Sequence, residues 1–317
     1  MSQRLTHARW PGLIAGMVVL AAWGLFLARQ MDELRAYPWQ ITPLALAWGV
    51  GWGALYFGGL AFCWALLLRQ VVGTGRVMPA AQVWLLSMMT RYIPGNVWHI
   101  LSRVALAHRL GVSRMHVLSS ASIEQVLTLL GALALVAVTL PFWSATGDWP
   151  IWWLWLLPIG LLLLHPRVLG TMLRWLAQRV KRPELAWQYT GYQIIALVLA
   201  YLGVMMLAGV ALLAVLGGMT LVHMHDIPLI LGASALGWAT GYLSLLTPSG
   251  LGVREAVITA LLALIYPLPV ATVSSLLFRV VLTLGELLAV VLAWIAAGGK
   301  PVTIPTTVAE PEDTQSL

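Results

Sequence analysis

Long apolar runs recur along the whole chain, with few charges inside them. They lie at residues 12–29, 43–68, 79–90, 96–110, 117–140, 151–165, 189–216, 228–247, 250–266 and 271–297. A helix needs about 20 apolar residues to cross the hydrocarbon core of a bilayer, and most of these runs approach or exceed that length. They are longer than the ~10-residue strands of an outer-membrane barrel. We therefore predict an all-α polytopic membrane protein, because helices satisfy their own backbone polar groups in lipid.

The composition agrees with this prediction. The 317 residues are 60% hydrophobic and 9% charged, whereas a soluble domain carries about 25% charged residues. The sequence has no charge-rich stretch of about 100 residues that would form a soluble catalytic domain. We expect residues 1–298 to form one transmembrane domain. Residues 299–317, rich in proline and acidic residues, are expected to form a disordered cytoplasmic tail.

Two segments with proline and glycine interrupt the apolar runs. The first break is Pro94-Gly95 and the second is residues 248–252. The run 79–90 is too short to span a bilayer, and the run 96–110 carries two arginines and two histidines, which a lipid-facing span would not. Non-helical backbone survives at membrane depth only where protein or a water-filled cavity surrounds it. We therefore expect each break to be the tip of a re-entrant helical hairpin.

The breaks divide the chain into related halves, near residues 1–145 and 146–298. Each break has two long apolar runs before it, and a short helix, a turn and a long helix after it. If both hairpins are re-entrant, each half crosses three times, and the halves have opposite topology. We predict about six full crossings plus two re-entrant hairpins arranged as an inverted repeat, the plan of many transporters. The alternative is eight ordinary spans.

The basic residues predict the orientation. With the N-terminus in the cytoplasm, most Lys and Arg residues fall on the cytoplasmic side, and Arg29 and Arg35 fall outside. This distribution follows the positive-inside rule. We expect both termini in the cytoplasm. The net charge of +7 then reflects topology, and we expect no nucleic-acid partner.

Five ionisable residues fall in or beside the apolar runs: Glu124, Arg254, Glu255, Arg279 and Glu286. Each costs about 2.5–3.5 kcal/mol at the centre of a membrane helix on insertion scales. They must therefore face one another, a cavity or a ligand. We expect Glu124 to contact Arg279. Glu124, Glu255 and Glu286 are candidates either for proton coupling or for structural ion pairs.

The second break is the sharpest candidate for a binding site. Gly250 and Gly252 let backbone approach a ligand closely, and Arg254 carries a planar donor fork suited to phosphate. The helix that begins near Leu251 adds free N–H groups and a positive dipole end. We predict a lipid head-group site here. In the structural alternative, Arg254 and Glu255 only satisfy neighbouring helices.

The first break has a related pattern. Arg91 precedes Pro94-Gly95, and Arg103 lies one turn beyond His99 on the following short helix. These residues are candidates to hold a head group that enters from the cytoplasmic side. In the alternative, the arginines snorkel and set topology.

Small residues at helical spacing predict where helices pack closely. They are the glycine pairs Gly12-x-x-x-Gly16, Gly49-x-x-x-Gly53 and Gly237-x-x-x-Gly241. We expect no metal or other cofactor. Cys63 is the only cysteine, and the His223–Asp226 stretch has no third cluster of ligands.

Two groups of residues around the breaks form a recognisable pattern: Arg91-Tyr92-Ile93-Pro94-Gly95-x-x-Trp98, Arg103 and Glu124-Gln125, then Pro248-x-Gly250-x-Gly252-x-Arg254-Glu255-Ala256 and Arg279. The pattern resembles the flippase-like transmembrane region of bacterial lysylphosphatidylglycerol synthases and its stand-alone relatives. The resemblance implies a protein of the bacterial inner membrane that moves or handles lipids between leaflets. The fused synthases add a soluble domain that makes aminoacylated lipid. Because this chain ends at Leu317, we expect neither that domain nor its activity.

The function we predict is a lipid translocator that moves a phosphate-bearing or anionic lipid between leaflets. The residues expected around the head group are Arg254, Glu255, Arg279, Arg103, Arg91, Gly250, Gly252, Pro94 and Gly95. The alternatives are an intramembrane enzyme acting on a lipid phosphate, or a membrane partner of a lipid-modifying or glycosyl-transfer enzyme. No nucleophile paired with a base and no nucleotide motif is visible in the sequence, so we do not expect catalysis.

Overall fold

The computed structural model describes residues 10–72, 77–92, 98–108, 110–143, 171, 191–244 and 250–298. The regular elements within these ranges are all helical. Four of them are long and apolar enough to cross a membrane: α4 (Pro43–Val72), α7 (Arg114–Thr139), α10 (Gly191–Gly217) and α13 (Leu268–Ala296). These four helices support the all-α membrane protein that the sequence predicts, and each overlaps a predicted apolar run.

Shorter elements precede or connect these four helices. They are α2 (Trp10–Arg29), α3 (Met31–Ala36), α5 (Val77–Met88), η1 (Met89–Tyr92), α6 (Trp98–His108), η2 (Leu140–Phe142), η6 (Met224–Asp226), α11 (Ile227–Leu243) and α12 (Val253–Leu262). Helices α5, α6 and α12 have 12, 11 and 10 residues. At 1.5 Å per residue they reach about half of the ~30 Å hydrocarbon core. The predicted crossing at 151–165, the break residues Pro94 and Gly95, and the tail 299–317 lie outside the described residues.

The two halves pack their helices in the same pattern. Helices α4, α5, α6 and α7 correspond in order to α10, α11, α12 and α13. The contacts α4–α5, α5–α6, α6–α7 and α4–α7 recur as α10–α11, α11–α12, α12–α13 and α10–α13. The contacts between halves are paired as well, with α4–α13 matching α10–α7 and α5–α13 matching α11–α7. The described helices therefore form two related four-helix units.

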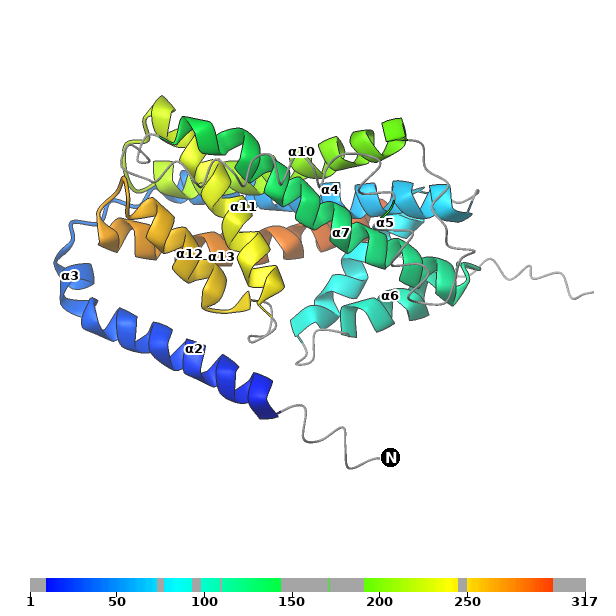
Figure 1. Ribbon diagram of the computed structural model, residues 1–317, viewed down its shortest axis with the longest axis horizontal. Helices are drawn as coiled ribbons and strands as arrows, with labels where there is room; N and C mark the ends of the chain where they lie inside the picture. Colours follow the sequence, from blue (N-terminus) through cyan, green and yellow to red (C-terminus); the bar gives the residue numbers. More distant parts are fainter. Residues whose placement is uncertain are drawn as a thin grey trace, which may run out of the picture.

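Corresponding helices run in opposite directions. Gly49 of α4 faces Val215 of α10, and Gly59 faces Val204, so residue numbers rise along one helix as they fall along the other. Figure 1 shows the same reversal between α7 and α13, whose colours progress from opposite ends of the molecule. In that view the α5–α6 hairpin lies at the right and the α11–α12 hairpin towards the left.

Glycines lie where helices pack closely together. Two of the predicted glycine pairs, Gly49-x-x-x-Gly53 and Gly237-x-x-x-Gly241, lie at such contacts. A Cβ added at Gly285 of α13 would lie 2.7 Å from the carbonyl carbon of Gly53 in α4. A Cβ added at Gly237 of α11 would lie 2.6 Å from Cγ1 of Ile258 in α12. Any larger residue at these positions would separate the helices. These contacts hold α13 against α4 and α11 against α12.

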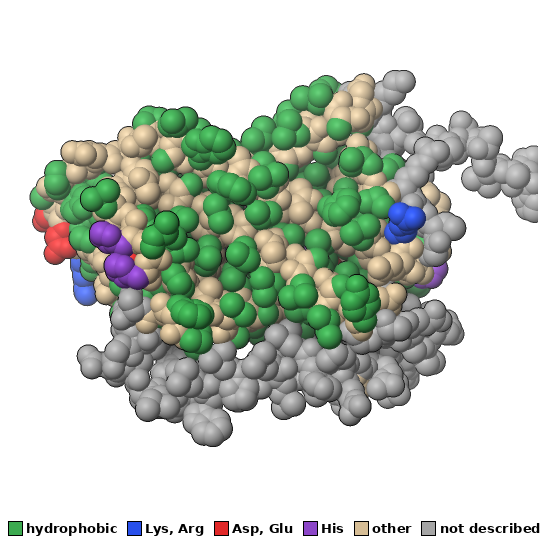
Figure 2. Space-filling view, turned by 90° about the horizontal axis from the view of Figure 1, so that it is seen from above, with side chains coloured by type: hydrophobic (Ala, Val, Ile, Leu, Met, Phe, Trp, Pro, Cys, Tyr) green, Lys and Arg blue, Asp and Glu red, His purple; other side chains and the backbone are tan. Residues whose placement is uncertain are grey.

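The surface is suited to lipid along the middle of the bundle. In Figure 2 the visible centre carries hydrophobic and uncharged side chains, and the charged ones lie towards the two ends. Large apolar side chains are exposed on all four long helices, among them Trp48, Val138, Leu199 and Trp294. A contiguous apolar surface of this kind marks a membrane or protein contact.

Candidate functional site

The first hairpin contains a fully buried arginine. Arg103 of α6 is 0% exposed and forms an ion pair with Glu124 of α7. The indole Nε1 of Trp84 donates a hydrogen bond of 2.5 Å to the other oxygen of Glu124. The Arg103 guanidinium lies over the rings of Trp64 and Trp84, at 4.9 and 5.2 Å from their centroids. Ion pairing and cation–π contacts together offset the cost of burying this charge.

This pairing corrects one prediction from the sequence. We expected Glu124 to contact Arg279, and that expectation is wrong. Both carboxylate oxygens of Glu124 are taken by residues of the first hairpin, and Arg279 pairs with Glu255 instead. The reason is local packing. Helix α6 lies against α7, and α12 lies against α13, so each charge meets a partner in its own half.

The second hairpin uses its glutamate to close the start of α12. One oxygen of Glu255 accepts a 2.7 Å hydrogen bond from the backbone N–H of Gly252, and the other pairs with Arg279. A carboxylate at this position also complements the positive end of the helix dipole. Glu255 thus fills part of the helix N-terminus that the sequence suggested for phosphate. Its two bonds fix both α12 and the Arg279 side chain.

The glycines of the second break have backbone conformations that other residues rarely adopt. Gly250 has φ = 67° and Gly252 has φ = 84°. A Cβ added at Gly250 would lie 2.6 Å from the Cα of Gly241 in α11. The close backbone approach at Gly250 is therefore to α11, and this glycine packs the two arms of the hairpin together.

An ion pair joins the two halves. Arg91, at the end of η1 in the first half, pairs with the buried Glu286 of α13 at 2.5 Å. The guanidinium also lies over the ring of Phe57, 5.7 Å from its centroid. Arg279 and Glu286 lie seven residues apart on α13, and both have ion-pair partners among the described residues.

Arg254 differs from the other interior arginines. It is half-buried, and its guanidinium lies over the ring of Phe278, 5.1 Å from the centroid. Within the described part of the chain, no carboxylate forms an ion pair with it. Tyr56 of α4 and Glu255 favour the charge of Arg254 electrostatically, whereas the positive charges of Arg279 and Arg91 oppose it. The two breaks therefore place their arginines in one region of the bundle.

His99 lies beside this region on α6. Arg103 and Arg91 place positive charge around the half-buried His99. Its Nδ1 and the Nη2 of Arg103 are buried and have no hydrogen-bond partner among the described residues.

Sequence reasoning missed the aromatic residues that surround the charges. Tyr56 and Trp64 lie eight residues apart on α4 and so share one face, and Phe278 directly precedes Arg279. They looked like ordinary residues of an apolar helix. The available signal was the repeat of large aromatic residues on the α4 face that meets the charged helices.

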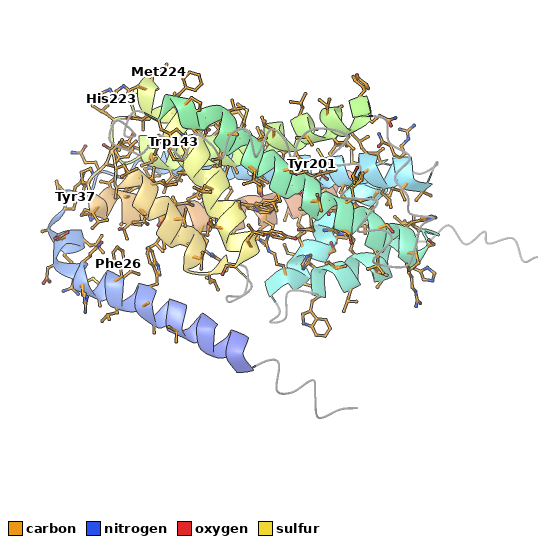
Figure 3. All side chains as sticks on the ribbon, in the orientation of Figure 1. Phe26, Tyr37, Trp143, Tyr201, His223 and Met224 are labelled. Atoms are coloured by element: carbon orange, nitrogen blue, oxygen red, sulfur yellow. The ribbon has the colours of Figure 1, made fainter. Side chains whose placement is uncertain are left out.

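A second polar cluster lies at the end of the molecule where Figure 3 labels Tyr37, His223 and Met224. The buried Asp226 accepts a 3.0 Å hydrogen bond from the hydroxyl of Tyr266 and lies 3.3 Å from the Nε2 of His225. Tyr266 follows α12, so this bond ties the far end of the second hairpin to the start of α11 and joins the two arms. Among the described residues no group of three or more His, Cys, Asp or Glu side chains could hold a metal ion.

Replacing Tyr266 by phenylalanine should lower the free energy of unfolding by about 1.5–3 kcal/mol, because a hydrogen bond to a buried carboxylate is lost. Burial and the bond to Asp226 raise the pKa of Tyr266 above its ordinary value. The raised pKa means that this stabilisation is complete below about pH 10 and declines as the pH rises further. Chemical unfolding at pH 7 and above pH 10 measures both effects. An unchanged midpoint at pH 7 would show that the bond contributes nothing.

No model of a known protein family matches the chain, and the comparison with curated proteins finds no similar sequence.

Proposed function

We propose that this chain is a membrane lipid translocator whose head-group site contains Arg254. The observation that supports it is the contrast between Arg254 and the other interior arginines. Those three form ion pairs, which we call the interior ion pairs: Arg91–Glu286, Arg103–Glu124 and Arg279–Glu255. Among the described residues Arg254 forms no such ion pair: Glu255 acts on it electrostatically, but the Glu255 carboxylate binds Arg279 and the Gly252 N–H.

A lipid phosphate is the natural partner at this depth. An uncompensated charge at the centre of a membrane helix costs about 2.5–3.5 kcal/mol on insertion scales, and an anionic ligand removes that cost. Phe278 lies against the face of the Arg254 guanidinium. The N–H groups project from the edge of that plane, in the geometry that suits bidentate binding of phosphate oxygens.

The proposed topology has about six crossings and two re-entrant hairpins in an inverted repeat. Three features support it: the short helices α5, α6 and α12, the matched helix contacts and the opposed directions of α4 and α10. In inverted-repeat transporters the substrate site lies at the repeat interface, formed by interrupted helices. The convergence of Arg91 and Arg254 fits such a site. This proposal also includes the bacterial inner membrane as the location of the protein, and its resemblance to the flippase-like family.

Cysteine labelling tests the topology. In a Cys63→Ser background, Ser113→Cys lies before α7 and Met224→Cys lies in the exposed η6 turn. We expect an impermeant thiol reagent to label Met224→Cys in intact cells, and to label Ser113→Cys only after the inner face is opened. Labelling of both variants from the same side would contradict the inverted arrangement.

Glu286 is the carboxylate we assign to proton coupling. Its ion pair with Arg91 connects the two halves, whereas the other two interior ion pairs lie within one half. Protonation would weaken this connection and favour movement of one half against the other. A proton gradient would then supply the energy for lipid movement.

Translocation in proteoliposomes tests the function. Purified protein is reconstituted with head-group-labelled anionic, aminoacylated, zwitterionic and polyprenyl lipids. The fraction of label that an external quencher can reach is then followed over time. We expect at least one phosphate-bearing class to move faster than in protein-free liposomes. If no class moves, the protein is not a translocator under these conditions. Phosphate release would instead favour an intramembrane enzyme.

A further inference from the structure

We infer that the last part of α13 is a gate that is hinged at Gly285 and closed against the first hairpin, and that a lipid enters the bundle through the seam between α5 and α13. Residues 287–296 of α13 are called the gate segment. This inference rests on the proposed function and adds the route by which its substrate reaches the site. It follows from the contacts along the seam, the exposure of the gate segment and the different packing of the matched seam between α7 and α11.

Two polar contacts close the seam between α5 and α13. The Nε2 of Gln82 in α5 donates a 3.2 Å hydrogen bond to the carbonyl oxygen of Ala293. Arg91, in the η1 turn that follows α5, pairs with Glu286 at 2.5 Å. The two contacts are seven residues apart on α13, about 10 Å along the helix. The seam therefore leads from the end of α13 to the ion pair that joins the two halves.

Both contacts can be released at little cost to the groups that make them. The carbonyl oxygen of Ala293 also accepts a 3.1 Å hydrogen bond from the N–H of Ala297, so it stays paired when Gln82 leaves. The side chain of Arg91 is 31% exposed, so water or a phosphate can take the place of Glu286 as its partner. Loss of the negative charge of Glu286 removes the ion pair itself.

The gate segment is poorly covered by the rest of the bundle. About a third of the apolar span of α13 is buried, 33%, against 50–56% for the other three long helices. Val291, Leu292, Trp294 and Ile295 are each at least 50% exposed. Lipid tails are as apolar as these side chains and solvate them in any position of the helix. The gate segment can therefore move without losing a buried apolar face.

The hinge lies at the inner end of the seam. A Cβ added at Gly285 would lie 2.7 Å from the carbonyl carbon of Gly53, so the backbones of α13 and α4 touch there. Val281 and Leu282 also lie against glycines of α4. Separating surfaces packed this closely loses dispersion contacts that lipid does not restore in full. Helix α13 is thus held against α4 as far as Gly285, and the gate segment begins two residues later.

The matched seam between α7 and α11 is closed in a different way. Gly131 of α7 corresponds to Gly285, and a Cβ there would lie 2.8 Å from the carbonyl carbon of Tyr201 in α10. Beyond Gly131, however, the end of α7 is tightly packed: a Cβ added at Gly232 of α11 would lie 2.7 Å from the Oγ1 of Thr139. No hydrogen bond or ion pair joins the described residues of α7 to those of α11. Close packing holds this seam, and polar contacts hold the other.

This difference makes the two halves unequal. The α5–α13 seam depends on one charge and one amide, which can change partners, whereas the α7–α11 seam has no such groups to release. In the proposed topology the gate segment ends on the cytoplasmic side. A lipid therefore enters from the inner leaflet, and its head group meets Arg91 where the seam ends.

Double electron–electron resonance of the full-length protein in lipid nanodiscs measures the seam directly. In a Cys63→Ser background, spin labels are placed on Met78→Cys of α5 and Val291→Cys of α13, both at exposed positions. We expect Glu286→Gln to lengthen the distance between the labels by about 5 Å, the scale of one helical turn. Gln82→Leu should shift the distance in the same direction by a smaller amount.

Matched controls identify the seam and the charge. Labels on Val138→Cys of α7 and Leu243→Cys of α11, also exposed, should keep their distance in Glu286→Gln. Glu33→Gln, which removes an exposed carboxylate from α3, should leave both distances unchanged. Circular dichroism checks that each variant is folded. If Glu286→Gln does not fold, Gln82→Leu carries the test.

A cross-link connects the gate to lipid movement. A short bifunctional thiol reagent that contains a disulfide joins Gln82→Cys to Ala293→Cys in the same Cys63→Ser background. We expect lipid movement in proteoliposomes to stop when the link forms and to return when the link is reduced.

The results separate the gate from the proposed function. An unchanged α5–α13 distance in the folded variants, equal lengthening across the α7–α11 seam, or lipid movement with the cross-link intact would overturn the gate even if the protein moves lipid. Lengthening that is confined to the α5–α13 seam, without movement of any lipid by the wild type, would uphold the gate and reject translocation.

Discussion

Replacing Glu124 by alanine is expected to lower the free energy of unfolding by about 3–5 kcal/mol, the cost of removing one partner of a buried ion pair. The variant leaves Arg103 charged and 0% exposed, and it also removes the acceptor of the Trp84 indole. Neither group can reach water without opening the first hairpin. Chemical unfolding in detergent, followed by circular dichroism, measures the loss.

Two further variants identify the cause of this loss. Glu33→Ala removes an exposed carboxylate from α3 and should change stability by less than about 0.5 kcal/mol. The double variant Arg103→Met, Glu124→Leu replaces both charges by apolar groups and should recover most of the stability, because no unpaired charge remains. A double variant as unstable as Glu124→Ala would show that the ion pair itself is not the source.

Alanine at Gly250 is expected to lower the free energy of unfolding by about 2–5 kcal/mol, from backbone strain and steric overlap together. The residue has φ = 67°, a conformation that costs a residue with a Cβ about 1–2 kcal/mol. The new methyl group would also lie 2.6 Å from the Cα of Gly241 and 2.7 Å from its carbonyl oxygen. Overpacking of this kind typically costs a further 1–3 kcal/mol or so.

Gly111 provides the matched control for Gly250. It has φ = 78°, and a Cβ there would meet nothing within 4 Å. Alanine at Gly111 should therefore show the backbone cost alone, about 1–2 kcal/mol. Equal losses at the two positions would mean that α11 moves away without cost, contrary to the close packing of the hairpin.

The sequence predicted the broad fold because lipid imposes strict rules on a chain. The long apolar runs and the Pro-Gly breaks were enough to locate α4, α7, α10 and α13, and to separate the short helices of each hairpin. Helix lengths follow bilayer thickness, and charges at depth require partners. These constraints act on local sequence and can be recognised without a structure.

The choice of partners could not be predicted in the same way. Glu124 and Arg279 occupy similar places in their halves, and that symmetry suggested a contact between them. Each pairs instead with the hairpin of its own half, because the register of α6 on α7 and of α12 on α13 decides which charges meet. That register depends on side-chain packing far apart in sequence.

Movement of a labelled anionic lipid in proteoliposomes, compared between wild type, Arg254→Gln and Arg69→Gln at equal protein density, tests the central claim most directly. Our account predicts that phosphatidylglycerol crosses with wild type and with Arg69→Gln, and that Arg254→Gln slows it by at least about tenfold. Wild-type rates in a folded Arg254→Gln variant would contradict the proposed site, and the absence of movement with wild type would contradict the function itself.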